Sequence, residues 1–125
     1  MISLASKKIM VTGGYGFLGK RLHIKLTEKN AEVFRFRRAE FNLVKEDAVT
    51  KAFERFRPEI VIHMAGDVGG IGYNREHPGT IMYNNLMMNT LVQEIARRNN
   101  VEKFIGIGSV CAYPKYSPVP FKEDD

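Results

Sequence analysis

The most informative part of the sequence is KKIMVTGGYGFLGKRLHIKL, residues 7–26. Its first residues form a short apolar run, which predicts a strand over 7–11. Leu18, Leu22 and Leu26 then recur every four positions, which predicts a helix over 17–29. Glycines with a spacing of three lie at or just after the junction, at positions 13, 16 and 19. Such a turn lets backbone approach a diphosphate, because the free amides and positive dipole end of the helix face the anion.

A glycine pattern alone also occurs in turns that have only a structural role. Here a strand precedes it and a helix follows it, so we expect a dinucleotide-binding site. Its predicted residues are Gly13, Gly14, Tyr15, Gly16, Phe17, Leu18 and Gly19.

Strands and helices alternate along the rest of the chain. Further strands are predicted over 32–36, 59–64 and 103–108, with helices ending near Arg57 and spanning 80–99. Residues 65–79 contain five glycines and are predicted to form a long loop, a class that is usually functional. This alternation predicts an α/β fold, a doubly wound parallel sheet of the Rossmann type with strand order 3-2-1-4. The ligand crevice would open between the first and fourth strands.

The composition fits one globular domain of 125 residues, 44% of them apolar and 26% charged. Cys111 is the single cysteine, so no internal disulfide can form, and no metal site is expected. No apolar run is long enough for a signal peptide or a membrane span. We therefore expect a soluble, cytoplasmic protein.

The net charge of +5 comes from residues 17–58, which hold eleven basic and six acidic residues. A basic region of this kind can serve a nucleic acid or an anionic small molecule. Its phenylalanines alternate with its arginines at strand and helix spacing, which core packing already explains. The small molecule is therefore favoured and no nucleic-acid partner is expected.

Arginines occupy the position where NAD enzymes commonly carry an acid for the ribose 2′-hydroxyl, about twenty residues after the glycine turn. Because guanidinium attracts a 2′-phosphate, we expect NADP(H), with Arg37 or Arg38 on the phosphate. Arg35 lies inside the strand and is not expected to be a ligand. The alternative is that these arginines are solvated charges. Further cofactor contacts are predicted at Asn42 and Leu43, over the adenine, and at Ala65, Gly66, Ile107 and Gly108.

The glycine turn TGGYGFLG resembles that of the extended short-chain dehydrogenase/reductase family, and the resemblance covers all four predicted strands. More specific segments follow: HMAGDVGGIGYNREHP at 63–78, IMYNNLMMNT at 81–90, GSVCAYPK at 108–115 and PVPFKED at 118–124. These resemble the GDP-L-fucose synthases. The resemblance implies epimerisation of C3 and C5 of GDP-4-keto-6-deoxymannose, followed by NADPH-dependent reduction at C4.

The resemblance also implies roles for individual residues. It places Val68, Gly69, Gly70 and Asn74 at the nucleotide-sugar substrate, Ser109 on the C4 oxygen, and Cys111 as acid or base at C3 or C5. A donor on a ketone oxygen acidifies the adjacent C–H groups, so a hydroxyl and a thiolate suit this chemistry. Without the flanking motif, a lone cysteine after a strand is more often a small buried side chain. By contrast, His63, at the end of the third strand, is expected to be a packed imidazole.

Alternatives remain at the level of function. GDP-mannose 3,5-epimerase, which keeps NAD bound and ends without net redox change, shares the DxGGxG spacing. The family's Y-x-x-x-K pair has no counterpart here, nor does its substrate domain. We therefore expect residues 1–125 to be the N-terminal part of an NADP-binding Rossmann domain, inactive alone; the alternative is a non-catalytic NADP-binding module. A homodimer of the intact enzyme is implied by the resemblance only.

Overall fold

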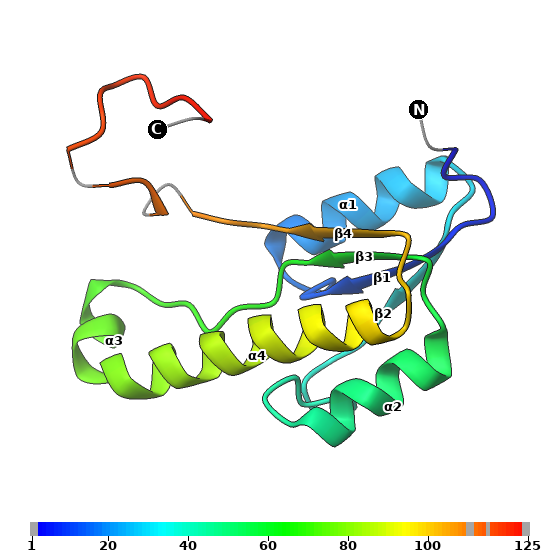
Figure 1. The fold of residues 1–125 in the computed structure, drawn as a ribbon, viewed down its shortest axis with the longest axis horizontal. Coiled ribbons are helices and arrows are strands. Elements are labelled where there is room, and N and C mark those ends of the chain that lie inside the picture. Colours follow the sequence, from blue (N-terminus) through cyan, green and yellow to red (C-terminus); the bar gives the residue numbers. More distant parts are fainter. Residues whose placement is uncertain (1–2, 110–111, 115, 124–125) are drawn as a thin grey trace.

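The computed structural model describes residues 3–109, 112–114 and 116–123 (Figure 1). Four parallel strands form one sheet in the order β2-β1-β3-β4. The strands are β1 (Lys8–Thr12), β2 (Glu32–Arg35), β3 (Ile60–His63) and β4 (Lys103–Gly106). The helices are α1 (Phe17–Glu28), α2 (Glu46–Phe56), α3 (Ile71–Glu76) and α4 (Pro78–Arg98).

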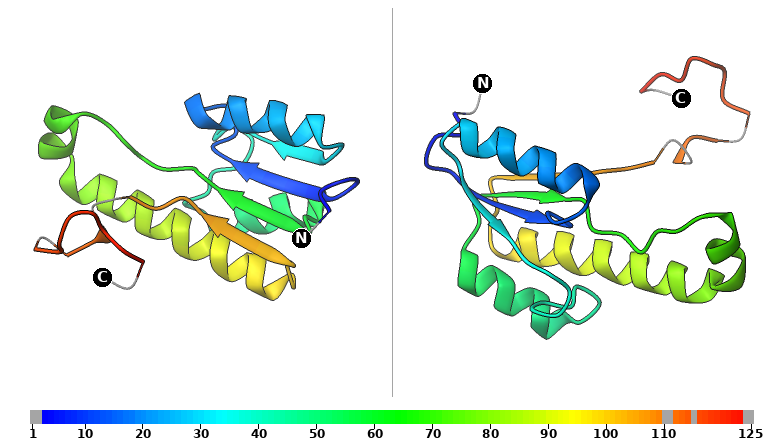
Figure 2. Two further views of the ribbon diagram at one scale, coloured as in Figure 1. Left: turned by 90° about the horizontal axis from the view of Figure 1, so that it is seen from above. Right: turned by 180° about the vertical axis from the view of Figure 1, so that it is seen from behind.

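Helices cover both faces of the sheet, with α1 on one face and α2 and α4 on the other (Figures 1 and 2). Side chains of β1 alternate between the two layers, as a strand requires. Ile9 and Val11 pack in the core beneath α1, whereas Met10 packs with Phe53 and Val92 on the opposite face. Apolar layers therefore fill the space between the sheet and the helices on both faces.

The doubly wound parallel sheet is confirmed, but the predicted strand order 3-2-1-4 is wrong. The third strand pairs with β1, Ile9 opposite Ile60, and does not lie outside β2. The helices α1 and α2 lie on opposite faces of the sheet. A right-handed crossover through α1 therefore moves the chain from β1 in one direction across the sheet, and a right-handed crossover through α2 moves it from β2 back in the other direction. Residues 36–45 form no strand that could occupy the position outside β2. The topological switch point therefore lies between β1 and β3.

The predicted loop 65–79 is shorter than expected. It contains α3, and α4 begins at Pro78, two residues before the predicted start. Proline suits this position, because the first helical residue needs no N–H donor and already has the φ that proline fixes. The end of α2 agrees with the prediction: Arg57 is left-handed, with φ 44°, directly before Pro58.

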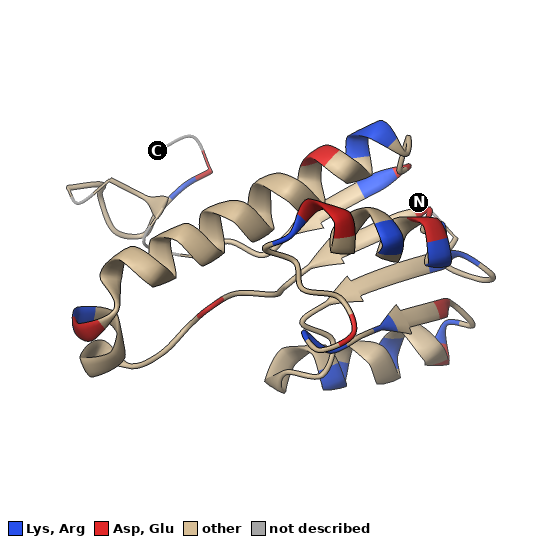
Figure 3. Cartoon of the chain, turned by 90° about the horizontal axis from the view of Figure 1, so that it is seen from below, with Lys and Arg blue, Asp and Glu red and all other residues tan. Residues whose placement is uncertain are grey.

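The described helices include none long and apolar enough to cross a membrane. Within the same residues, no group of three or more His, Cys, Asp or Glu is placed to hold a metal ion. Figure 3 shows that α4 carries charge only towards its end; the sequence from Pro78 to Gln93 contains no Lys, Arg, Asp or Glu.

Candidate functional site

The glycine turn brings α1 close to the ends of β1 and β3. Gly13 has φ +68°, and a Cβ there would lie 2.9 Å from backbone atoms of Met64 and Ala65. A Cβ on Gly19 would lie 2.5 Å from the Gly13 carbonyl oxygen. The Gly16 N–H donates to that same oxygen at 2.9 Å and closes the turn. Only glycine fits at positions 13 and 19, so these two residues allow the close approach.

The amino end of α1 is open. Gly16 is its N-cap, and no side chain of the described residues forms a hydrogen bond that caps this end. The first turn of the helix contains no acidic residue. The amides of Phe17, Leu18 and Gly19 have no acceptor inside the helix, and the helix dipole adds positive potential there. This end of α1 can therefore bind an anion.

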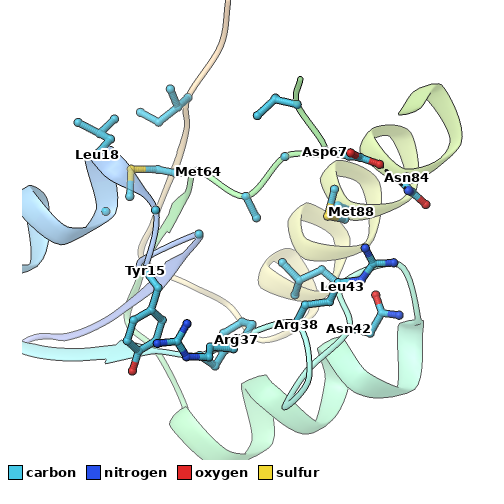
Figure 4. A pocket seen from close by; sticks show the side chains of 18 of the residues that line it. Tyr15, Leu18, Arg37, Arg38, Asn42, Leu43, Met64, Asp67, Asn84 and Met88 are labelled. Carbon is cyan, nitrogen blue, oxygen red and sulfur yellow. Dashed lines mark hydrogen bonds between the residues drawn. The ribbon is translucent and has the colours of Figure 1, made fainter. Parts of the chain in front are cut away.

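A cavity of about 630 Å³ lies at the carboxyl edge of the sheet, in front of the open end of α1 (Figure 4). Ligand sites commonly measure roughly 300–1,000 Å³. All predicted cofactor residues except Gly14 and Gly108 line it: Gly13, Tyr15, Gly16, Phe17, Leu18, Gly19, Arg37, Arg38, Asn42, Leu43, Ala65, Gly66 and Ile107. Segments that follow all four strands thus converge on one cavity.

The two arginines predicted to bind phosphate separate within this cavity. The Arg37 guanidinium carbon lies 4.3 Å from the centre of the Tyr15 ring. Arg38 extends the other way, towards α4, on the side of Asp67 (Figure 4). Among the described residues, neither arginine forms an ion pair. Both charges are therefore available to an anion. Asn42 uses its Oδ1 within its own loop, where it accepts the Val44 N–H at 3.2 Å.

Thr12 and His63 connect β1 to β3 at the same edge. Thr12 Oγ1 accepts the N–H groups of Met64 and Ala65 at 3.1 and 3.2 Å, so its own proton points to His63 Nδ1, 2.6 Å away. His63 Nε2 then carries a proton and donates to Asn89 Oδ1 at 2.8 Å. Burial lowers the pKa of His63, which the bond to Asn89 opposes only in part. His63 is thus a neutral, packed imidazole, as predicted.

Asp67 fastens the loop after β3 onto α4. Its carboxylate accepts the Asn84 amide at 2.7 Å and the Tyr73 hydroxyl at 3.0 Å. Its backbone N–H donates to Asn85 Oδ1 at 2.7 Å, and its carbonyl accepts from Asn85 Nδ2 at 2.9 Å. The hydrogen bonds from Asn84 and Tyr73 lower the pKa of Asp67. An ionised carboxylate therefore holds this part of the cavity wall in place.

Comparison with known proteins now adds to this geometry. The model of the NAD dependent epimerase/dehydratase family matches residues 9–125. The chain belongs to this family.

Its relatives include the GDP-L-fucose synthase of Sinorhizobium fredii, 36% identical over 99% of this chain and 40% of that protein. The GDP-L-colitose synthase of Yersinia pseudotuberculosis is 32% identical over 94% of this chain and 38% of the relative. Among solved structures, the GDP-mannoheptose C4 reductase MlghC of Campylobacter jejuni, with NADP bound, superposes with a TM-score of 0.88 at 30% identity. The superposition covers 99% of this chain and 39% of the reductase. The chain thus spans about 40% of the length of these relatives.

The predicted substrate residues of this family member divide into two groups. Val68 lines the cavity, with 84% of its surface exposed. Asn74 instead donates from Nδ2 to the carbonyls of Gly69 and Gly70 at 3.0 and 3.1 Å, so these three residues support the shape of the loop. Their role as substrate contacts stays a prediction.

Ser109, one of the two predicted catalytic residues, follows β4 in the chain. The Ile107 N–H donates to the His63 carbonyl at 3.0 Å, so pairing continues one residue past β4. Ser109 comes next in the chain, and its carbonyl accepts the Ala112 N–H at 3.0 Å. Cys111 lies outside the described residues. Both catalytic assignments stay predictions.

Six cavity residues were not predicted: Phe36, Val44, Met64, Asp67, Asn84 and Met88. Asn84 and Met88 are four positions apart and therefore share one face of α4. This four-residue spacing, on the helix that follows the predicted loop, is the signal in the sequence that could have identified Asn84 and Met88. Asp67 is the only acid between Gly66 and Gly72, which is a signal for a defined partner.

Proposed function

We propose that this chain is the cofactor-binding half of an NADPH-dependent enzyme acting on a GDP-4-keto-6-deoxy sugar. The reaction is epimerisation at C3 and C5 and reduction at C4, which makes GDP-L-fucose. The observation that carries the proposal is the convergence on one cavity of the open α1 end and two arginines that form no ion pair with any described residue. Membership of the epimerase/dehydratase family and relatives named GDP-L-fucose synthase and GDP-L-colitose synthase support it.

The cavity suits NADP(H). The amides at the start of α1 would hold the diphosphate, Asn42 and Leu43 would flank the adenine, and Arg37 or Arg38 would bind the 2′-phosphate. The turn around Gly13 and Gly19 already leaves no room for side chains, which allows backbone to approach the diphosphate. When bound, this cofactor supplies hydride for reduction of a carbonyl.

On this proposal, residues after β4 act on the sugar. Ser109 donates its hydroxyl to the C4 oxygen, and this hydrogen bond acidifies the C–H groups next to the carbonyl. Cys111 exchanges a proton at C3 or C5. Val68, Gly69, Gly70 and Asn74 contact the nucleotide sugar.

A second candidate is a GDP-sugar 3,5-epimerase that keeps NAD bound and ends without net redox change. The DxGGxG spacing, which begins at Asp67, is shared with such enzymes. Arg37 and Arg38 favour the reductase, because an acid is common at their place in NAD enzymes. A third candidate, a non-catalytic NADP-binding module, is favoured by the lack of a Y-x-x-x-K pair in these 125 residues.

Calorimetric titration of this chain with NADP⁺ and NAD⁺ tests the cofactor. We expect tighter binding of NADP⁺, by about 10- to 100-fold, since each hydrogen bond to a charged group contributes about 1.5–3 kcal/mol. The preference should disappear in Arg37→Ala combined with Arg38→Ala. Arg75→Ala, an exposed arginine outside the cavity, is the matched control. Equal affinities of the unmodified chain for the two cofactors would contradict the proposal.

The reaction is tested on the product of the whole reading frame, in which we expect a Y-x-x-x-K pair beyond Asp125. With GDP-4-keto-6-deoxymannose and NADPH, the reductase consumes the absorbance of the reduced nicotinamide. Proton exchange at C3 or C5 without that loss identifies the epimerase. If neither the loss of absorbance nor the proton exchange is seen, the protein is the non-catalytic binding module.

The uncharged part of α4 suits a homodimer contact. Met82, Tyr83 and Leu86 expose 65%, 57% and 55% of their surfaces on a segment that carries no charge. Large exposed apolar side chains gathered in this way mark interaction surfaces. Sedimentation velocity of the whole protein and of its Leu86→Glu variant tests this: a dimer is expected to become a monomer.

A further inference from the structure

Tyr15 holds two guanidinium groups beside the glycine turn. The Arg35 and Arg37 guanidinium carbons lie 4.5 and 4.3 Å from the centre of its ring. The register of the sheet explains this arrangement: Val11 pairs with Arg35, so β2 ends beside the turn that follows β1. Arg37 lies two residues past the end of β2, and its guanidinium reaches the same ring.

The two charges gather without a carboxylate between them. In the part of the chain that the structure describes, neither Arg35 nor Arg37 forms an ion pair. The Glu40 carboxylate accepts the backbone N–H of Arg37 at 2.9 Å. Arg35 donates from Nη1 to the Gly14 carbonyl at 3.3 Å. The ring face and a carbonyl dipole thus stabilise the guanidinium groups, and their charge is left for an anion.

Stacking leaves the donors of a guanidinium usable. The contact with a ring uses the flat face of the group, whereas its N–H bonds lie in the plane and point outwards. A phosphate can therefore accept two parallel hydrogen bonds from the same arginine. Arg37 and Tyr15 both line the cavity, whereas Arg35 does not, and Arg38 extends towards α4 instead (Figure 4).

We infer that Tyr15 is the positioning residue of a phosphomonoester site in which Arg37 is the ligand and Arg35 adds charge from outside the cavity. The inference rests on the proposed cofactor, whose adenosine 2′-phosphate is the phosphomonoester. It assigns cofactor selectivity to Tyr15 and Arg37 and gives Arg38 no part in it. Residue 15 thus sets the orientation of a side chain that follows the neighbouring strand.

The test compares adenosine 2′,5′-bisphosphate with adenosine 5′-monophosphate by calorimetric titration of this chain. The ratio of their affinities isolates the 2′-phosphate, and a general loss of structure does not change it. We expect Tyr15→Leu to reduce the ratio roughly 3- to 10-fold, as the loss of a cation–π contact predicts. Tyr15→Phe keeps the ring and should keep the ratio. Tyr116→Leu, a tyrosine that is 87% exposed and lies outside the cavity, is the matched control.

Three results would overturn the inference: an unchanged ratio in Tyr15→Leu, equal losses in Tyr15→Leu and Tyr15→Phe, or an unchanged ratio in Arg37→Ala. If the unmodified chain binds both nucleotides equally, the phosphate site is refuted while a dinucleotide site stands. If neither nucleotide binds, the proposed cofactor site is refuted as well.

Discussion

Replacing Gly19 by alanine is expected to push α1 away from the glycine turn. The new Cβ would lie 2.5 Å from the Gly13 oxygen and from the Gly14 Cα, and ordinary contact begins near 3.4 Å. The helix must therefore move by about 0.9 Å, because both neighbours are backbone atoms that cannot rotate away. Overpacking of this kind typically costs about 1–3 kcal/mol. At about 4 °C per kcal/mol for a domain of this size, Tm should fall by about 4–12 °C.

The same movement displaces the amides that face the cavity. Loss of one hydrogen bond to a charged group should weaken NADP⁺ binding at least about tenfold. Thermal unfolding and calorimetric titration measure the two effects. Gly79→Ala on α4 is the matched control: its Cβ meets nothing within 4 Å, and alanine favours the helix by about 1 kcal/mol. A Gly19→Ala protein with unchanged Tm and NADP⁺ affinity would refute the role assigned to this close approach.

Three further predictions concern the hydrogen bonds around the cavity. Thr12→Val should lower the free energy of unfolding by about 2–4 kcal/mol in urea titrations, whereas Thr12→Ser should not. In the valine variant the Ala65 N–H and His63 Nδ1 lose their partner, and the Met64 N–H keeps only the Thr12 carbonyl, at 3.3 Å. Burial lowers the pKa of His63, so near pH 6.5 the unfolded chain binds a proton that the folded chain does not. The free energy of unfolding should therefore fall as the pH is lowered from about 7.5 to about 5.5. If His63→Gln shows the same fall, undiminished, this reasoning is contradicted. For Asp67, whose pKa is lowered by Asn84 and Tyr73, the stabilisation of the loop is present above about pH 4 and is lost as the pH falls further. Hydrogen exchange of the α3 amides should be fast in Asp67→Asn at neutral pH, and slow exchange there would count against the role of the carboxylate.

Local patterns predicted most element boundaries to within two residues. Periodicity of apolar side chains and the left-handed residues at helix ends are properties of short segments, as Arg57 before Pro58 illustrates. The helix α3 escaped prediction because six residues give too few turns for a periodic signal. It is stabilised by contacts from outside itself: the Tyr73 hydroxyl binds Asp67, which α4 holds in turn.

The separate directions of Arg37 and Arg38 also could not be predicted. Both follow β2 in the sequence, and either was expected to bind the phosphate. The direction of each side chain depends on the turn at residues 38–40, where strand alternation has ended. It depends as well on Tyr15, which meets Arg37 only because β1 and β2 pair in a particular register.

The cavity lies at the predicted edge of the sheet, although the strand order was wrong and β3, not the fourth strand, lies next to β1. In any parallel sheet all carboxyl ends lie on one edge, so the segments after the strands converge there whatever the order. In a doubly wound sheet the direction in which the chain adds strands also reverses next to the first strand, because successive crossovers use opposite faces of the sheet. The glycine turn after β1 must then lie at the reversal, beside β2 on one side and β3 on the other. This is why Arg37 from one neighbour and Ala65 from the other meet at the open end of α1.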